Sequence, residues 1–201
     1  MKKNIAVFFD RDGTINEEVG YMDSLDKLKI YPVAAQAIRL INLSKMKAIV
    51  ITNQSGVARG LFNEELVRTV NERIQSDLNK IGAYIDKFYY CPHHPTEGMG
   101  AYLQTCNCRK PSPGMLLSAA AEFNINLTES YLVGDTFRDI QAAKKAGLKS
   151  VLVKTGYGAA LFLNREPAEA GPENIPDFVA EDILEAVQWI LRDRKDGNFE
   201  K

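Results

Sequence analysis

The 201-residue sequence has few of the features that mark a secreted or membrane-bound protein. It contains three cysteines, an odd number, and all of them lie between Cys91 and Cys108, which does not fit the disulfide framework of a small secreted domain. Long apolar runs are also lacking. The run that follows the basic start ends at Asp10, too early for a secretory signal or a membrane span. We therefore expect a cytoplasmic protein with no membrane partner.

An excess of charge of either sign is absent as well. The net charge is −1, from 25 basic and 26 acidic side chains, so the chain has no broad attraction for nucleic acid, and any phosphate must be recognised locally. With 45% apolar residues, this length suits one sizeable core rather than two. We expect a single domain over residues 1–201, without a nucleic-acid partner or an obligate protein partner.

Short apolar, β-branched or aromatic runs alternate with helical patterns along the chain. The predicted strands are residues 5–9, 48–51, 87–90, 131–133 and 150–153. One predicted helix is capped by Asn63 and runs to Ile81, and a second opens with Ser112 as N-cap and Pro113 as first residue and ends near Phe123. Two more cover about residues 138–146, before Gly147, and about residues 182–191.

This alternation of strands and helices predicts an α/β fold with one doubly wound, mainly parallel sheet and helices on both faces. Residues 155–177 are rich in Gly, Pro, Asn and Glu and are expected to form a surface loop. There is room for only a loop and one helix between Asp12 and the second strand. We therefore expect no separate cap domain over the sheet.

Polar side chains follow three of the predicted strands. Asp10 and Asp12 follow the first strand, Thr52 the second, and Asp135 and Asp139 the fourth. In sheets of this kind ligands bind beyond the carboxyl ends of the strands. These carboxylates and this hydroxyl are therefore expected to face one crevice.

The carboxylates alone leave several interpretations open. The Asp-x-Asp-Gly-Thr segment at residues 10–14 is also typical of a simple turn. A calcium loop of the EF-hand type fits poorly, because its twelfth position would be Tyr21 and a strand precedes it. Convergent carboxylates repel one another, and Mg²⁺ would relieve that repulsion while keeping coordination positions open for a phosphate substrate. Lys110 and Thr52 would then serve the phosphoryl oxygens.

Four segments carry a family resemblance. VFFDRDGT, ITN, CRKP and VGDTFRD occur in this order and resemble the motifs of the haloacid dehalogenase superfamily of aspartyl-phosphate phosphatases. Within it, DRDGTIN, TNQSGVARG, YYCPHHP and CRKPSPGML make about residues 5–158 similar to the D-glycero-D-manno-heptose-1,7-bisphosphate 7-phosphatase family, with histidinol phosphatases as nearest relatives. The resemblance implies a Mg²⁺-dependent phosphatase of heptose biosynthesis, which leads to lipopolysaccharide or another glycoconjugate.

The resemblance also implies a role for each matched residue. Asp10 would be the nucleophile that forms an aspartyl-phosphate, and Asp12 the general acid and base. Mg²⁺ would be held by the Asp10 carboxylate, the Asp12 backbone carbonyl and Asp135. Asp139 would orient a metal-bound water or Lys110, while Thr52 and Lys110 stabilise the transferring phosphoryl group.

Substrate recognition is expected from segments around these motifs, because no cap domain is present to provide it. The segment from Glu18 to Tyr21 and the loop before Lys110 would close over the small phosphorylated sugar. The predicted substrate-binding residues are Arg11, Glu18, Val19, Gly20, Tyr21, Asn53, Gln54, Ser55 and Arg109.

The three cysteines and both histidines gather in residues 91–108. Cys91-x-His93, twelve residues and Cys106-x-Cys108 provide the ligand set of a closed, structural zinc site. A cysteine nucleophile is disfavoured because Asp10 has that role, and the loop lacks Lys and Arg between its ligand pairs, which argues against a nucleic-acid-binding finger. Unrelated buried cysteines remain the other interpretation. His94 is left outside the predicted ligand set.

The predicted zinc loop ends immediately before Arg109 and Lys110, so the metal would fix the direction of those two cations. The twelve-residue gap resembles the heptose enzymes, whereas histidinol phosphatases have a shorter gap. The heptose enzymes often have Lys after the last motif's Asp, where this chain has Thr136. Alternatives are a histidinol-phosphate or other small-ester phosphatase, a polynucleotide 3′-phosphatase, which the charge balance disfavours, and a non-catalytic sugar-phosphate binding module.

Overall fold

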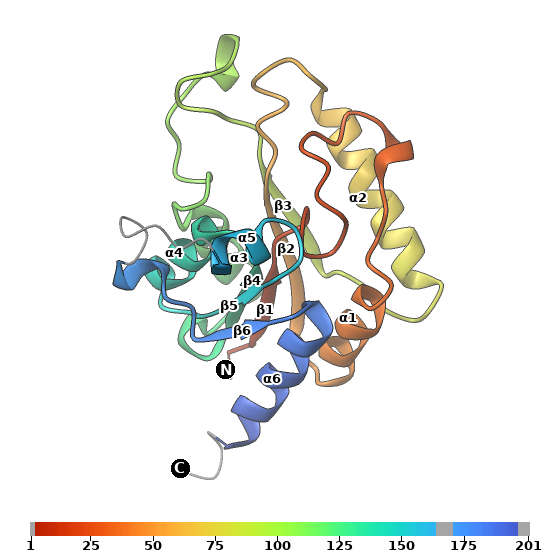
Figure 1. Ribbon diagram of the computed structural model, residues 1–201, viewed down its shortest axis with the longest axis vertical. Coiled ribbons are helices and arrows are strands. Elements are labelled where there is room, and N and C mark those ends of the chain that lie inside the picture. Colours follow the sequence, from red (N-terminus) through yellow and green to blue (C-terminus); the bar gives the residue numbers. More distant parts are fainter. Residues whose placement is uncertain (1–2, 164–170, 197–201) are drawn as a thin grey trace.

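The computed structural model describes residues 3–163 and 171–196, and a parallel six-stranded sheet lies at its centre (Figure 1). The strand order is β3-β2-β1-β4-β5-β6. The strands are β1 Ala6–Phe9, β2 Lys47–Asn53, β3 Lys87–Cys91, β4 Tyr131–Gly134, β5 Lys149–Val153 and β6 Phe178–Ala180. Phe9 at the end of β1 is in register with Val50 of β2 and Val133 of β4. The segments that follow these three strands therefore begin at the same edge of the sheet.

The five predicted strands are confirmed, each within two residues at either end. β6 was missed. It has only three residues at the edge of the sheet and lies between Asp177 and Glu181, so its apolar pattern is too short to be distinguished from a loop.

Helices cover both faces of the sheet. They are α1 Ala34–Leu43, α2 Glu64–Asn79, α3 Gly114–Phe123, α4 Phe137–Ala146, α5 Gly158–Leu163 and α6 Ile183–Asp196. Val7 and Phe9 of β1 pack in one apolar layer with α1, α2 and α6, and Ala6 and Phe8 pack in the other layer with α3 and α4. This alternation follows from the two-residue period of a strand, and it confirms the predicted doubly wound arrangement.

Three helix boundaries differ from the prediction. The N-cap of α3 is Pro113 and not Ser112, because the Ser112 amide donates to the carbonyl of Arg109 in a preceding turn. α2 stops at Asn79, which leaves Ile81 beyond the helix and 52% exposed. α6 continues past the predicted end to Asp196.

The predicted surface loop at residues 155–177 is wrong in part. It contains α5 and a short 3₁₀ turn at Pro172–Asn174, while residues 164–170 lie outside the described part of the chain. α5 has small or apolar residues throughout its GAALFL sequence, and the Gly, Pro, Asn and Glu residues of the wider segment made this short helix look like part of a loop.

No inserted domain lies between the strands that carry the predicted site. Residues 10–46, all of which the structure describes, form a 3₁₀ turn at Leu25–Lys27 and α1. Residues 54–86 contain only α2, and the 91–108 loop contains only the 3₁₀ turn Gly100–Tyr102. Within the described ranges, no helix combines the length and the apolar character needed to cross a bilayer.

Candidate active site

The segments after β1, β2 and β4 line one cavity of about 300 Å³ at the carboxyl edge of the sheet. Most predicted site residues meet there, namely Asp10, Asp12, Glu18, Gly20, Tyr21, Thr52, Asn53, Gln54, Ser55, Arg109, Lys110 and Asp135. The structure does not bring Arg11 or Val19 to the cavity. The Arg11 side chain is fully buried beside Asp12, and Val19 packs against the apolar core.

Lys110 lies at the base of this cavity between two carboxylates. Its Nζ is 2.6 Å from Asp139 and 2.9 Å from Asp10, and it donates to the carbonyl of Ile51 at 2.9 Å. Burial alone would lower the pKa of Lys110, but the two carboxylates raise it above its ordinary value. Lys110 therefore remains a cation although its side chain is buried.

Three carboxylates meet beside this lysine. Oxygens of Asp10, Asp135 and Asp139 lie within 4.8 Å of one another. Burial raises the pKa of Asp10 to about 7, with Lys110 opposing the rise and Asp139 adding to it. Burial, followed by repulsion from Asp10 and Asp139, raises the pKa of Asp135 to about 8. One lysine does not neutralise three carboxylates, and an all-oxygen donor set of this kind fits a hard cation such as Mg²⁺.

Two glycines hold the Asp135 carboxylate in place. A Cβ at Gly13 or at Gly156 would overlap Oδ2 of Asp135, and both residues have positive φ, +79° and +57°. The backbone N–H of Tyr157 donates to the same oxygen at 2.9 Å. The Asp135 carboxylate is therefore fixed from two loops, those after β1 and β5, whose contact requires residues without a side chain.

Asp12 is surrounded by donors. Its carboxylate accepts hydrogen bonds from Arg11 at 2.9 Å, Asn16 at 2.9 Å and Gln54 at 2.7 Å. Burial alone would raise the pKa of Asp12, but the charge of Arg11 and the hydrogen bonds from Asn16 and Arg11 lower it. Arg11 is itself braced by Asn71 of α2 at 3.2 Å. Asp12 is thus an ionised carboxylate in this arrangement.

The residues at the end of β2 are bound to their neighbours. Asn53 donates to the backbone carbonyl of Lys110 and accepts from its backbone N–H, each at 3.0 Å. Gln54 donates to the Thr52 hydroxyl at 2.8 Å in addition to Asp12. Asn53 therefore holds the backbone of Lys110 in register with β2, although the two residues are 57 positions apart.

The rim of the cavity includes an acidic residue. One oxygen of Glu18 accepts the backbone N–H of Gly20 at 2.5 Å, and burial raises the pKa of Glu18 above its ordinary value. Tyr21 beside it is 37% exposed. Tyr157, from the loop after β5, also lines this rim and was not predicted, because no motif contains it.

Basic side chains that the sequence motifs do not predict also line the cavity. Arg59, His94 and Arg138 line the cavity together with Arg109. The pKa of Arg109 is lowered chiefly by burial, and the charges of Arg138 and Arg59 lower it further. Burial, Arg109 and Arg59 lower the pKa of His94 in turn, so the ring is neutral. Arginines on a loop and a helix are typical of a solvated surface, and only their shared cavity marks these as site residues.

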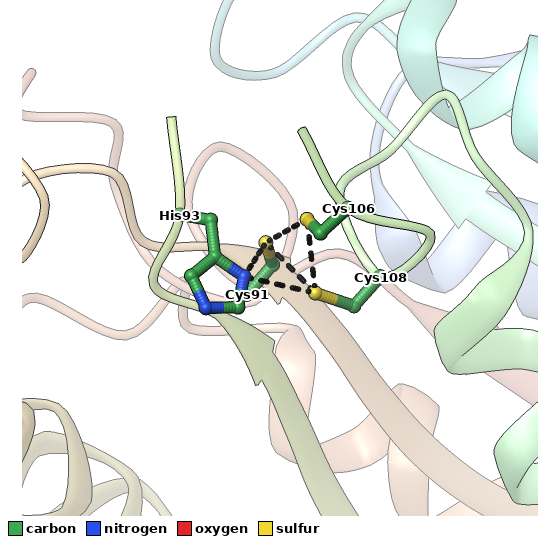
Figure 2. A group of neighbouring side chains, drawn as sticks. All are labelled: Cys91, His93, Cys106 and Cys108. Carbon is green, nitrogen blue, oxygen red and sulfur yellow. Dashed lines mark hydrogen bonds between the residues drawn. The ribbon is translucent and has the colours of Figure 1, made fainter. Parts of the chain in front are cut away.

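The side chains of the four predicted zinc ligands point toward one another (Figure 2). Ligand atoms of Cys91, His93, Cys106 and Cys108 lie within 4.8 Å of one another, and none of the cysteines forms a disulfide. Burial opposes ionisation, yet hydrogen bonds from Cys108 and Cys91 lower the pKa of Cys106 to about 7. This favours a thiolate, the form that binds metal.

The spacing of these atoms tests whether zinc fits. The sulfur–sulfur distances are 3.1, 3.2 and 3.5 Å, and Nδ1 of His93 is 3.4 and 3.8 Å from two of the sulfurs. In a tetrahedron with Zn–S of about 2.3 Å and Zn–N of about 2.0 Å, these edges would be about 3.8 and 3.5 Å. The cluster is therefore compatible with a closed tetrahedral metal site and needs to expand only slightly.

Two tyrosines, Tyr90 in β3 and Tyr102 in the 91–108 loop, anchor this region to α2. Tyr90 and Tyr102 donate to the two oxygens of Glu64 at 2.6 and 2.7 Å. On its other side the loop is held by the ion pair of Glu97 with Arg59. The loop therefore has fixed attachments besides the cysteine–histidine cluster.

Comparisons with known proteins agree with this geometry. A family model described as HAD-hydrolase-like matches residues 107–186. The D-glycero-beta-D-manno-heptose-1,7-bisphosphate 7-phosphatase of Escherichia coli (strain K12) is 38% identical over 197 residues, 97% of this chain and 98% of the relative. The enzyme of the same name from Pasteurella multocida (strain Pm70) is 45% identical over 157 residues, 78% and 84% of the two chains.

The fold has a matching counterpart among solved structures. The D,D-heptose 1,7-bisphosphate phosphatase from B. bronchiseptica, complexed with magnesium and phosphate, superposes with a TM-score of 0.81 and 31% identity. The superposition covers 94% of this chain and 99% of the other.

Proposed function

The chain belongs to the family of D-glycero-beta-D-manno-heptose-1,7-bisphosphate 7-phosphatases, and on this premise we propose that it removes the 7-phosphate of heptose 1,7-bisphosphate. One observation carries the choice of substrate, namely the 38% identity to such a phosphatase over 98% of its length. The cavity supports the chemistry, because three carboxylates converge there beside the buried cation of Lys110.

Asp10 is the residue best placed to attack the phosphorus atom. Its carboxylate lies in the cavity, and Lys110 holds one of its oxygens at 2.9 Å. Attack forms a bond between a carboxylate oxygen and phosphorus, and the bond from phosphorus to the sugar oxygen breaks. Water then hydrolyses the acyl phosphate and restores the carboxylate. Lys110 and the Thr52 hydroxyl stabilise negative charge on the transferring group.

Asp12 moves the protons in this scheme. As an ionised carboxylate it is prepared to take a proton from the hydrolytic water. To protonate the sugar oxygen in the first half-reaction it must carry a proton, and the donors Arg11, Asn16 and Gln54 oppose that. We infer that Arg11, which is fully buried and donates to Asp12 at 2.9 Å, positions Asp12 and does not itself bind substrate.

Asp10, Asp135 and the backbone carbonyl of Asp12 would hold Mg²⁺, with Asp139 oriented toward Lys110 by its capping contacts. The ion, when bound, neutralises the phosphate and orients it for in-line attack. Oδ2 of Asp139 accepts from the Thr136 hydroxyl at 2.6 Å, which fixes the carboxylate that holds Lys110. A relative whose structure holds magnesium and phosphate supports the choice of metal.

We propose that the cysteine–histidine cluster binds structural zinc. Four protein ligands leave no open coordination position, so the metal would fix the loop rather than react. Cys108 directly precedes Arg109 and Lys110, and the clamp would set where both cations point. The setting that we propose for the protein is cytoplasmic, since an odd number of cysteines does not fit a disulfide framework.

We also propose that the whole chain acts as one phosphatase domain in which loops replace a cap. The 91–108 loop and the segment from Glu18 to Tyr21 border the cavity that a cap would otherwise cover. Asn53 at the end of β2, with Gln54 and Ser55 directly after it, lines one side of the cavity, where the three would contact the phosphate and the sugar.

Phosphate release from a small panel tests the proposal. The panel comprises both anomers of heptose 1,7-bisphosphate, histidinol phosphate and a 3′-phosphorylated oligonucleotide, each assayed with Mg²⁺. We expect the highest kcat/KM with one anomer of the heptose bisphosphate. A higher value for histidinol phosphate would contradict the assigned substrate, and no release from any ester would contradict the phosphatase itself.

A further inference from the structure

Asn71 is the polar member of an otherwise apolar set of buried residues on α2. Its side chain is only 6% exposed, and the other buried residues of the helix are Val67, Val70, Ile74 and Leu78. A buried amide costs free energy unless it is hydrogen-bonded. Its partner is Arg11, whose Nη1 donates to Oδ1 of Asn71 at 3.2 Å.

Arg11 is a buried cation that uses both edges of its guanidinium group. On one edge Nε and Nη2 donate to Asp12 at 3.2 and 2.9 Å, and on the other Nη1 donates to Asn71. The group is planar and rigid. The bonds to Asp12 therefore fix Arg11 relative to that carboxylate, whereas the bond to Asn71 fixes the pair relative to α2.

The remaining contacts of Asp12 do not replace this link. Asn16 and Gln54 donate to one oxygen each, at 2.9 and 2.7 Å. Asn16 belongs to the same turn as Asp12, and Gln54 is shared with the Thr52 hydroxyl. Arg11 contacts both oxygens of Asp12 and carries the charge. The direction of the Asp12 carboxylate therefore depends chiefly on Arg11.

We propose that Asn71 is a positioning residue for the general acid, acting through Arg11 on Asp12. α2, which the structure describes throughout, contributes no side chain to the cavity, so Asn71 acts without touching the substrate. A general acid must lie within hydrogen-bond reach of the atom that it protonates. A carboxylate that lost its tie to α2 would protonate the leaving oxygen less effectively.

The inference rests on the proposed function and adds a residue to it. In that scheme Asp10 forms a bond to phosphorus, the bond from phosphorus to the leaving oxygen breaks, and the proton of Asp12 passes to that oxygen. Loss of Asn71 should therefore matter most for esters whose leaving oxygen needs the proton most.

Aryl phosphates separate this role from a structural one. Phenolate is a poorer leaving group than 4-nitrophenolate, so phenyl phosphate depends more on protonation, and neither ester makes the contacts of a sugar. Asn71→Leu has a similar size and no acceptor. With Mg²⁺-loaded enzyme it should lower the ratio of kcat/KM for phenyl phosphate to kcat/KM for 4-nitrophenyl phosphate at least about tenfold. A loss of folded protein lowers both values equally and leaves the ratio unchanged.

Asn71→Asp keeps an oxygen acceptor at the same place and should recover most of the wild-type ratio. If Asn71→Leu does not fold, Asn71→Ala, which adds no larger apolar group, takes its place with the same expected loss.

Gln75→Leu is the matched control. Gln75 lies one turn further along α2, away from the cavity, and its Oε1 accepts the backbone N–H of Ile85 at 3.0 Å. It should lose stability and keep the wild-type ratio. A wild-type ratio in Asn71→Leu, or an equal fall in Gln75→Leu, would overturn the positioning role and leave the proposed function intact.

A measurement without turnover tests the same link. Nε–H of Arg11 donates to Asp12, and ¹⁵N NMR follows its exchange with solvent once the signal is assigned by its absence from Arg11→Lys. We expect exchange at least roughly tenfold faster in Asn71→Leu than in the wild-type protein or Gln75→Leu. Equal rates in all three would overturn the positioning role even in a protein that cleaved no ester, whereas the lack of turnover by itself contradicts only the proposed function.

Discussion

At the scale of single residues, the site depends on contacts between groups that are far apart in the sequence. The motifs predict that Asp10, Lys110 and Asp135 come together, because each follows a strand or a fixed loop. They do not predict that Asn53 binds the backbone of Lys110 in both directions. Nor do they predict that Arg11 is buried against Asp12 and Asn71, since those contacts depend on side-chain directions that only the packed turns determine.

Gly13→Ala should damage activity more than stability. The new Cβ would overlap the Asp135 carboxylate and displace a proposed metal ligand, while the positive φ of +79° adds strain of about 1–2 kcal/mol. We expect kcat/KM to fall at least about a hundredfold, a loss of about 2.7 kcal/mol or more in transition-state stabilisation. Steady-state kinetics and thermal melting measure both effects.

Gly82→Ala is the control for strain alone. Gly82 has a similar φ of +72°, and its added Cβ would meet only the Arg39 side chain at 3.8 Å. It should lose comparable stability and keep its activity. Equal kinetics in the two variants would show that the Gly13 backbone does not position Asp135.

At the scale of elements, the 91–108 loop is where spacing in the sequence predicted structure most directly. Two ligand pairs separated by twelve residues indicated a tetrahedral site, and the structure brings their four ligand atoms together. The contacts of Tyr90 in β3 and Tyr102 in the loop with Glu64 were not predicted, because neither tyrosine has a characteristic partner that a sequence pattern indicates. The edge strand β6 was missed for a similar reason, since three residues carry too little pattern.

Cys108→Ser should loosen the loop that carries Arg109 and Lys110. Purified wild-type protein is expected to hold about one zinc per chain, and loss of a thiolate ligand should lower metal affinity by at least about tenfold. The melting temperature and kcat/KM should both fall, because metal binding contributes to folding. Metal analysis, melting and kinetics provide the measurement.

Thr105→Ser, an exposed position of the same loop outside the cluster, is the control and should resemble the wild-type protein. Absence of zinc from the wild-type protein, or a Cys108→Ser variant that melts and turns over normally, would contradict the structural role of the metal.

The docking of α6 on the sheet should depend on pH. Asp193 of α6 binds Lys149 of β5 at 2.6 Å and accepts from the Tyr131 hydroxyl at 2.6 Å. Burial alone would raise the pKa of Asp193, but these two partners lower it. Because the pKa of Asp193 is lower in the folded state, its ionised form stabilises the fold at pH values above the unfolded-state pKa of about 3.9. This stabilisation is lost as the pH falls through the folded-state pKa.

Asp193→Asn keeps an acceptor for Tyr131 and removes the charge. It should therefore cost about 0.5–1 kcal/mol of unfolding free energy at pH 7 and progressively less below about pH 4. Urea unfolding of the wild-type and Asp193→Asn proteins, at pH 7 and at a pH below about 4, measures this difference in unfolding free energy. A deficit that stayed the same at low pH would mean that the ion pair does not contribute.

At the scale of the whole molecule, the fold follows from the alternation of strands and helices, and the cavity follows from the parallel direction of the strands. What the sequence could not predict is which solvated-looking side chains reach that cavity. Arg59 and Arg138 have the sequence setting of surface residues, yet both face it. Arg59 lies in the loop after β2 and Arg138 at the start of α4. The distance between these two segments depends on the order of the strands in the whole sheet, so no local sequence pattern predicts it.

The position of the phosphate that leaves the substrate tests the central claim most directly. We would follow heptose 1,7-bisphosphate by ³¹P NMR with the Mg²⁺-loaded wild-type enzyme and with Asp10→Asn, whose amide is a poor phosphoryl acceptor. The account predicts that the wild-type enzyme converts the 7-phosphate signal into inorganic phosphate, that the 1-phosphate signal persists, and that folded Asp10→Asn leaves both signals unchanged. Release of the 1-phosphate, or turnover by Asp10→Asn at near the wild-type rate, would contradict it.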